Sequence, residues 1–319
     1  MVAASARWVL LAAGLLLAPV AHATAQRTFV HSAPVGDDTN TAFNCSLSKP
    51  CRSFSAALGL TLAGGEIVVL DSAGYGPVTI TQAVTIVAPA GVYAGITVPA
   101  SGTGVKVQAG AADAVTLRGI TIECVGGNFG IEYLSGRILV VDRADIGGCS
   151  IGIQQTSGGN LSLRDSSVAD GGAGVDVKGS PGKNPEFTIE RTQFSNESTV
   201  GVNVWSGLGY VRHSSVSHTC FSCSFSRGIY ALGDTYGSPI TNVTLDAVML
   251  SDNKIGAEVD SGPGAAATIR VTRSVATRND KGFSIRSGAS GTTEFRSLNN
   301  SLDDGNTNPS SPRTTLTPY

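Results

Sequence analysis

Six polar and aromatic residues recur at matching positions of a glycine-marked repeat, where they could bind a sugar polymer. They fall two or four residues after a glycine in a short apolar strand, at positions whose side chains should point outward. Aromatic rings can stack on sugar rings, and carboxylate or amide groups can bond sugar hydroxyls. The alternative is a solvated face whose aromatics cover neighbouring side-chain stems. The candidate binding residues are Asp176, Lys178, Asn203, Trp205, Tyr230 and Glu258.

The same face raises a catalytic alternative, a lyase or glycoside hydrolase that acts on an acidic polysaccharide. β-Elimination from a uronate needs a base and a cation that stabilises the developing anion, and Lys178 beside Asp176 and Glu258 could serve. Calcium would be needed only in such a lyase, and intervening coils separate these acids. A retaining glycosidase needs two carboxylates about 5 Å apart. Asp145 and Asp165 are the nearest pair, but neighbouring arginines explain them as ion-pair partners. No other cofactor and no metal site is predicted.

The six cysteines suggest an oxidising compartment. Cys45 and Cys51 flank a short polar loop and are expected to pair. Cys124 and Cys149 fall at nearly the same place in consecutive coils, which lie about 4.8 Å apart, so they are also expected to pair. The Cys220-x-x-Cys223 motif is compatible with a zinc or redox site. A second ligand pair is missing, however, which favours a local disulfide or free thiols.

A repeat of glycines predicts the elements that position these residues. The glycines lie 22 to 28 residues apart, a period typical of a solenoid whose coils bury their apolar sides by stacking. Each coil reads as three short strands joined by tight bends. The sequence therefore predicts an all-β fold, a right-handed parallel β-helix with three strands per coil. The repeating glycines are Gly130, Gly152, Gly174, Gly201, Gly228, Gly256 and Gly282.

Stacking the coils on this period turns two sets of polar residues into rows. Like charges one strand apart repel and opposite charges pair, so a row of alternating sign indicates structure rather than catalysis. Asx side chains stabilise turns, so the second row is also interpreted as structural. The first row comprises Arg118, Asp142, Arg164, Glu190, Arg212 and Asp246. The second comprises Asp170, Asn196, His218, Asp252 and Asn279.

The ends of the chain differ from the repeat. Residues 1–25 have the charged start, apolar run and small-residue cleavage site of a signal peptide. Residues 26–66 are expected to form an N-terminal cap with an amphipathic helix at 52–63, capped by Ser53 and ended by Gly64 and Gly65. The β-helix is assigned to residues 67–298 and a flexible C-terminal tail to residues 299–319.

Composition narrows the partners and the cellular address. Only 14% of residues are charged and the formal net charge is −2, unlike the basic surface of a nucleic-acid-binding protein. No second apolar run is long enough to span a membrane after signal cleavage. The protein is therefore expected to be exported, to the periplasm or the exterior. Oligomeric state does not follow from the sequence.

The chain resembles exported bacterial right-handed parallel β-helix proteins of the pectin-lyase-like superfamily. The resemblance rests on the cap, with Gly36-Asp37-Asp38, Pro50-Cys51-Arg52-Ser53-Phe54 and Gly64-Gly65-Glu66-Ile67, and on the generic repeat that follows. It covers nearly all of the chain after the signal sequence. It implies the fold, whereas activities within that superfamily include lyases, hydrolases and adhesins.

The catalytic motifs of that superfamily are missing from the repeat. The chain contains no His-Gly, Arg-x-Lys or Trp-x-Asp-His, and its Asp-Asp pairs, Asp37-Asp38 and Asp303-Asp304, fall in the cap and the tail. We therefore expect an exported scaffold that binds a polysaccharide or a cell-surface glycan on an exposed strand face.

Overall fold

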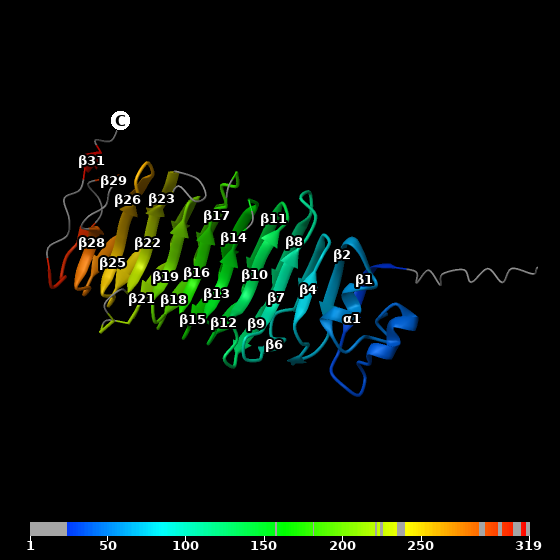
Figure 1. Ribbon diagram of the computed structural model, residues 1–319. Helices are drawn as coiled ribbons and strands as arrows, with labels where there is room; N and C mark the ends of the chain where they lie inside the picture. Colours follow the sequence, from blue (N-terminus) through cyan, green and yellow to red (C-terminus); the bar gives the residue numbers. More distant parts are fainter. Residues whose placement is uncertain are drawn as a thin grey trace, which may run out of the picture.

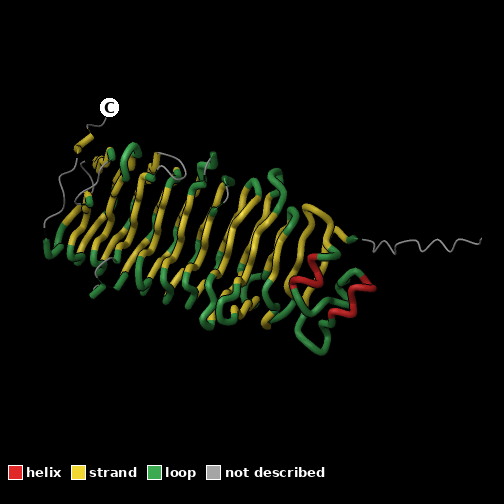
Figure 2. The backbone as a smooth tube through the Cα atoms, in the orientation of Figure 1, coloured by secondary structure: helices red, strands yellow, loops and turns green. Residues whose placement is uncertain are grey.

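The protein is an elongated stack of coils with a small cap at its N-terminal end (Figure 1). The computed structural model describes residues 24–156, 158–180, 182–220, 222–223, 226–234, 240–286, 291–298, 302–308 and 314–316. Residues 1–23, which hold most of the predicted signal peptide, lie outside this part of the chain. Among these described residues, helix appears only near the N-terminal end (Figure 2). The predicted all-β solenoid with three strands per coil is confirmed.

Each complete coil passes through three parallel sheets, here named sheets 1, 2 and 3 in chain order. Sheet 1 contains β1 (Ala25–Val30), β2 (Thr61–Val69), β5 (Val84–Val87), β8 (Ala114–Arg118), β11 (Ile138–Asp142), β14 (Asn160–Arg164), β17 (Glu186–Glu190), β20 (Leu208–Arg212), β23 (Ile240–Asp246), β26 (Ala266–Thr272), β29 (Thr292–Leu298) and β31 (Thr314–Leu316).

Sheets 2 and 3 complete the coil. Sheet 2 contains β3 (Ala73–Gly74), β6 (Ala94–Val98), β9 (Ile120–Cys124), β12 (Asp145–Gly147), β15 (Ser167–Ala169), β18 (Gln193–Ser195), β21 (Ser215–Ser217), β24 (Met249–Ser251), β27 (Val275–Thr277) and β30 (Leu302–Asp303). Sheet 3 contains β4 (Val78–Ile80), β7 (Thr103–Gln108), β10 (Phe129–Ser135), β13 (Ile151–Gln155), β16 (Ala173–Lys178), β19 (Val200–Trp205), β22 (Arg227–Gly233), β25 (Ile255–Ser261) and β28 (Lys281–Ile285).

The repeating glycines lie in sheet 3, and their role is close approach between coils. A Cβ atom on Gly174 would lie 2.6 Å from the carbonyl oxygen of Gly201 in the next coil. The other glycines of the row, up to Gly256, meet the next glycine's carbonyl in the same way. Any larger residue would force the stacked strands apart, so a glycine recurs at this position once in every coil of the row.

The registers expected from the repeat are confirmed. In sheet 1, Leu139 pairs with Val115 and Leu161, and all three side chains face the apolar interior. Farther along, Phe187 pairs with Gly209, and the Phe187 ring occupies the space where a side chain at 209 would lie. A large residue in one coil thus compensates for glycine in the next, which keeps the core filled.

The cap differs from its prediction. Helix α1 spans only Phe54–Leu58, with Ser53 at its N-cap as expected, and a 3₁₀ helix spans Asp38–Phe43. The predicted helix at 52–63 is wrong beyond Leu58, because Thr61 already pairs with β1 and its hydroxyl bonds Thr28 in the sheet. Sheet pairing therefore overrides the helical pattern of the last residues.

Each coil bends between sheets 1 and 2 and again between sheets 2 and 3, and from β8 to β28 each of these bends contains a residue in the left-handed backbone region. At the bend between sheets 1 and 2 the charged row alternates as predicted, since Asp142 is in register with both Arg118 and Arg164. At the bend between sheets 2 and 3 one assignment is wrong. Arg278, with a φ of 53°, occupies the turn position, and Asn279 is buried one residue later.

Both predicted disulfides are present, and Cys220 and Cys223 form a third. Their Cα atoms lie 4.9 Å apart in Cys45–Cys51, 4.9 Å in Cys124–Cys149 and 5.4 Å in Cys220–Cys223. The second joins consecutive coils at the bend between sheets 2 and 3. The Cys220-x-x-Cys223 motif forms a local disulfide, one of the two outcomes that the sequence favoured.

The C-terminal segment assigned to a tail continues the stack wherever it is described. Strand β30 pairs with β27, and β31 pairs with β29. The rest of residues 299–319 lies outside the described part. No helix among the described residues is long and apolar enough to cross a membrane.

Candidate functional site

The outer face of sheet 3 contains the predicted binding residues, and their registers are as expected. Asp176, Asn203, Tyr230 and Glu258 form one continuous row across β16, β19, β22 and β25. Lys178 and Trp205 belong to a second row nearer the end of the strands. We call this surface the sheet-3 face. Parallel pairing thus brings all six residues to one side of the solenoid.

Asp176 lies at the centre of the first part of this face. Its side chain is nearly buried, yet it is on the outer side of the strand. The Lys178 ammonium lies 2.9 Å from Asp176 Oδ2, and Asn203 Nδ2 donates to Oδ1 at 2.9 Å. The carboxylate is therefore held in place by neighbours in two coils, which leaves Lys178 and Trp205 as the accessible groups.

Trp205 is the exposed aromatic of the face. Its side chain is 38% exposed, and Lys178 Nζ lies 6.0 Å from the centre of its ring. A cavity of about 490 Å³ opens beside the ring. The residues that line this cavity are Thr156, Lys178, Gly179, Ser180, Trp205, Ser206 and Asp234. An apolar ring surrounded by hydroxyls and charges is suited to a ligand with both apolar and polar faces, such as a sugar.

The expectation that Tyr230 is exposed beside Trp205 is wrong. Tyr230 is only 6% exposed, because Arg227 packs its guanidinium 4.3 Å from the ring centre. The hydroxyl donates to Asp260 Oδ2 at 2.8 Å, and Arg286 Nη1 donates to that hydroxyl at 3.2 Å. Burial and the bond to Asp260 raise the pKa of Tyr230 to about 12. The phenol therefore stays protonated at neutral pH.

Glu258 is buried in an ion pair with Arg227 on the neighbouring strand. Asp260, two residues later on β25, pairs with Arg286, whose Nη1 lies 3.2 Å from Oδ2. Tyr230, Glu258 and Asp260 with the two arginines thus form one compact polar cluster, and its acids each have a cationic partner.

Three members of this cluster were not among the predicted site residues. Asp260 and Arg286 lie in the second outward row. Charged residues are common at outward positions, so nothing in the sequence pointed to a role for these two. Arg227 could have been predicted from the sequence, because it stands where the preceding coils have the apolar residues Ala173 and Val200. A charge in an otherwise apolar row is the kind of exception that marks a site.

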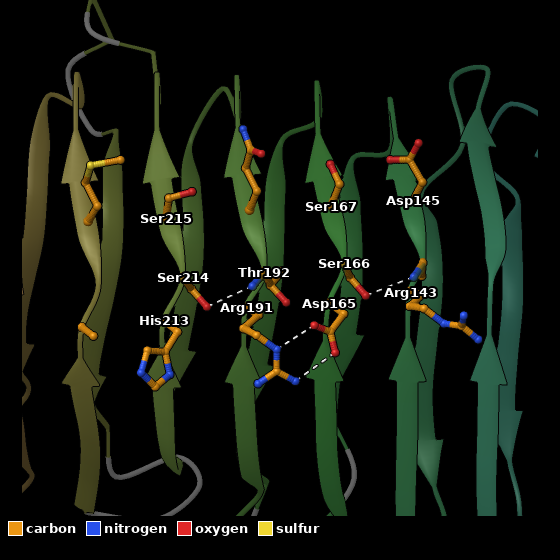
Figure 3. Close-up of a pocket in the computed structure, with 14 residues that line it drawn as sticks. Arg143, Asp145, Asp165, Ser166, Ser167, Arg191, Thr192, His213, Ser214 and Ser215 are labelled. Atoms are coloured by element: carbon orange, nitrogen blue, oxygen red, sulfur yellow. Dashed lines mark hydrogen bonds and ion pairs between the residues drawn. The ribbon is translucent and has the colours of Figure 1, made fainter. Parts of the chain in front are cut away.

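A larger hollow lies at the bend between sheets 1 and 2, on a different side of the coil (Figure 3). It has a volume of about 800 Å³ and crosses several coils. Arg191 grips Asp165 with two bonds, of 2.7 and 2.9 Å, which confirms the interpretation of Asp165 as an ion-pair partner. The hydroxyls of Ser166 and Ser214 bond backbone carbonyls of their own coils. Much of this lining therefore has a structural role.

Comparison with known proteins supports the architecture. A solved structure entitled "Crystal structure of pectate lyase Pel9A" is similar, with a TM-score of 0.56 and 14% sequence identity, over 91% of this chain and 80% of that one. This likeness shows the fold alone. No curated protein matches the sequence. A family model described as "Right handed beta helix region" matches residues 37–221, more than half of the chain. The protein therefore belongs to the right-handed β-helix family.

Proposed function

We propose that the protein binds a polysaccharide on the sheet-3 face and that Trp205 is the residue on which a sugar ring stacks. The observation that carries the proposal is the exposed Trp205 ring beside the cavity of about 490 Å³. Lys178 and the hydroxyls of Thr156 and Ser180 surround that ring, so polar groups are at hand for sugar hydroxyls. The structural likeness to a pectate lyase favours a polysaccharide over other polar ligands.

Trp205→Ala tests this proposal directly. The wild-type protein should bind at least one member of a polysaccharide panel in affinity electrophoresis or calorimetry. Loss of the ring should weaken that binding by about tenfold or more, as is usual for an aromatic anchor. Tyr210→Ala is the matched control, because Tyr210 is 45% exposed but lies on sheet 1. Equal affinity of wild type and Trp205→Ala for every bound polysaccharide would refute the site.

The buried cluster around Tyr230 favours a second candidate, catalysis on an acidic polysaccharide. Tyr230 retains its proton and could serve as a general acid, whereas Arg286 could stabilise a developing anion. Glu258 or Asp260 would be the base. Only a lyase reaction would require a metal ion, and that ion would be calcium.

An absorbance assay separates the two candidates. A lyase would raise ultraviolet absorbance with a uronate polymer and calcium, and a hydrolase would release reducing ends without that rise. Asp260→Asn should abolish either activity while leaving binding through Trp205 intact. If neither signal appears across a broad panel, the catalytic candidate fails and the binding proposal is unaffected.

We also infer that the protein works outside the cytoplasm. The three disulfides are typical of proteins from oxidising compartments. Cell fractionation of the native host, followed by determination of the mature N-terminus, would test both export and cleavage near residue 25.

A further inference from the structure

Three arginines surround one carboxylate at the bend between sheets 1 and 2. Asp142 is only 8% exposed, and Arg118 Nε donates to its Oδ2 at 2.8 Å. Arg164 Nε, from the next coil, lies 3.3 Å from Oδ1, and Nε of Arg143, the residue that follows Asp142 in the chain, lies 3.8 Å from Oδ2. We call Arg118, Arg143 and Arg164 the arginine cluster. One carboxylate can balance only one of these three charges.

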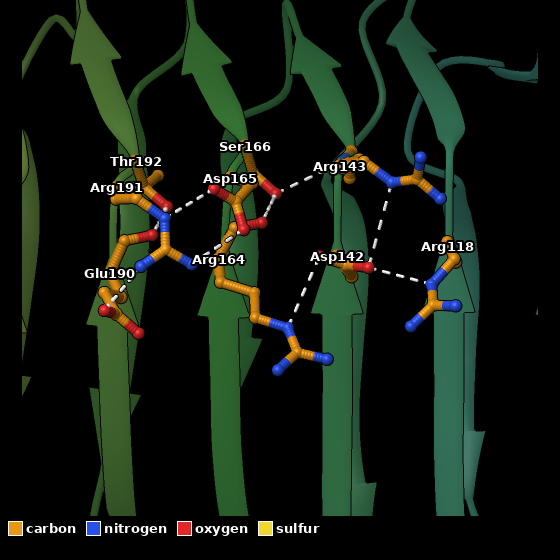
Figure 4. Close-up of polar contacts among 10 residues, drawn as sticks. Arg118, Asp142, Arg143, Arg164, Asp165, Ser166, Glu190, Arg191 and Thr192 are labelled. Atoms are coloured by element: carbon orange, nitrogen blue, oxygen red, sulfur yellow. Dashed lines mark hydrogen bonds and ion pairs between the residues drawn. The ribbon is translucent and has the colours of Figure 1, made fainter. Parts of the chain in front are cut away.

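Each of these contacts uses the Nε atom. A guanidinium has five N–H donors, so the two terminal Nη groups of every arginine remain available for another acceptor. Figure 4 shows the guanidinium ends of Arg118 and Arg164 on either side of Asp142, extending past it. The three side chains are 40–49% exposed, so solvent or a ligand can reach these ends.

The excess of positive charge is reduced by the next acid along the bend, because the charges of Arg143 and Arg164 also help to lower the pKa of Asp165. Farther along, Arg191 contacts both Asp165 and Glu190, so two acids share one arginine. At the other bend, between sheets 2 and 3, the pairing is one to one, as in Arg278 with Asp252. The whole chain has a formal net charge of −2, so a local excess of arginine is unusual for this molecule.

We propose that the arginine cluster binds the oxyanion of an acidic polysaccharide, a uronate carboxylate or a sulfate ester. The planar guanidinium fork matches such groups with two parallel bonds, and Arg is preferred over Lys where that geometry is needed. Arg143 is the member of the cluster that lines the hollow of Figure 3, and the hollow continues past Ser167 and Ser215, so a chain bound at Arg143 has room to extend along the solenoid. The ligand class rests on the proposed function, but the site lies on a different sheet from Trp205.

The test is binding of three probes to the wild type and to the double variant Arg118→Gln/Arg164→Gln. The probes are an oligogalacturonate, a heparin oligosaccharide and uncharged dextran, measured by calorimetry at low salt. Charge-assisted hydrogen bonds predict that the variant binds at least one anionic probe about tenfold more weakly. Arg278→Gln, which breaks a one-to-one pair, is the control and should bind as the wild type does. The anionic probe that binds identifies carboxylate or sulfate as the ligand.

Asp142→Asn gives an independent test of opposite sign. It removes the buried negative charge and keeps an oxygen acceptor for Arg118, so the cluster should bind the anionic probe more tightly. The proposal is overturned if the wild type binds neither anionic probe, or if the double variant binds as tightly as the wild type. It is also overturned if the asparagine variant binds more weakly. Since Trp205→Ala leaves the cluster intact, loss of binding in that variant alone concerns only the sheet-3 face.

Discussion

The two bends of each coil satisfy the same backbone need with different side chains. At the bend between sheets 1 and 2, Ser214 donates its hydroxyl to Arg212 O and accepts the N–H of Thr192 from the preceding coil. At the bend between sheets 2 and 3, Asn279 accepts the N–H of Asn253 and donates to Leu250 O, both in the preceding coil. Both residues follow a turn position in the left-handed region.

The difference lies in how far each side chain reaches along the stack. A serine hydroxyl bonds one backbone carbonyl of its own coil and one backbone N–H of the preceding coil. The buried asparagine side chains also bond one another from coil to coil, as Asn253 Nδ2 does with Asn279 Oδ1 at 3.1 Å. At the bend between sheets 2 and 3, the buried side chains therefore form one hydrogen-bonded row in the interior. At the bend between sheets 1 and 2, arginines and acids occupy the outer surface. We expect substitutions at the second bend to cost more stability.

Glu197 is the exception in the interior row. It occupies the position equivalent to Thr219 and Asn253 in later coils and is 1% exposed. Burial raises the pKa of Glu197 to about 8, the Gly171 backbone amide opposes that rise, and the charge of Asp170 adds to it. The folded protein therefore holds a proton that the unfolded chain releases above its ordinary pKa of 4.5.

The largest expected effect is a loss of stability as pH rises. Between the unfolded pKa and about 8, stability should fall by about 1.4 kcal/mol per pH unit through this one proton, then level off. Glu197→Gln should remove that contribution. Urea denaturation from pH 5 to pH 8 checks this, and identical slopes for wild type and variant would contradict it.

Asn279→Ala should show the next largest effect. It deletes the bonds to Asn253, Leu250 and Asn306 in a fully buried position. Buried groups left without partners predict a loss of about 3 kcal/mol in the free energy of unfolding. Asn160→Ala, at an exposed position on sheet 1, is the control for an amide that lies outside the row.

Ser214→Ala should cost less, because only one hydroxyl is lost at the other bend. The Thr192 N–H would lose its acceptor, which predicts about 1 kcal/mol. Thermal unfolding of the two variants side by side measures the comparison. If Ser214→Ala were the more damaging of the two, the ranking of the bends would be reversed.

Asp165→Asn should produce the smallest effect. The pKa of Asp165 is lowered, first by its bonds to Arg191, but both side chains are more than a third exposed, so solvent screens the pair. We expect no resolvable change in the denaturation midpoint at neutral pH. A clear loss would show that exposed ion pairs at this bend contribute measurably to the free energy of unfolding.

The sequence predicts the stacking well because a period-two pattern and one obligatory glycine per coil leave few alternative registers. It does not separate Arg278 from Asn279, since an Asx residue suits both a turn and an interior position. The burial of Tyr230 depends on Arg227 in its own coil and on Arg286 in a later coil. The residue pattern of a single strand does not show which side chains from other coils will cover it. The sequence thus predicted that the candidate binding residues share one face of sheet 3, but not the pairing among them.

The disulfide between Cys124 and Cys149 also affects how the molecule would come apart. Coils that touch only their neighbours can peel from either end, one after another. This bond fastens two consecutive coils covalently, so peeling that starts at the C-terminal end should halt there until the bond is reduced. A protease acting on the oxidised protein should then leave a resistant N-terminal fragment that ends beyond β12. After reduction of the disulfide, this fragment should no longer be protected.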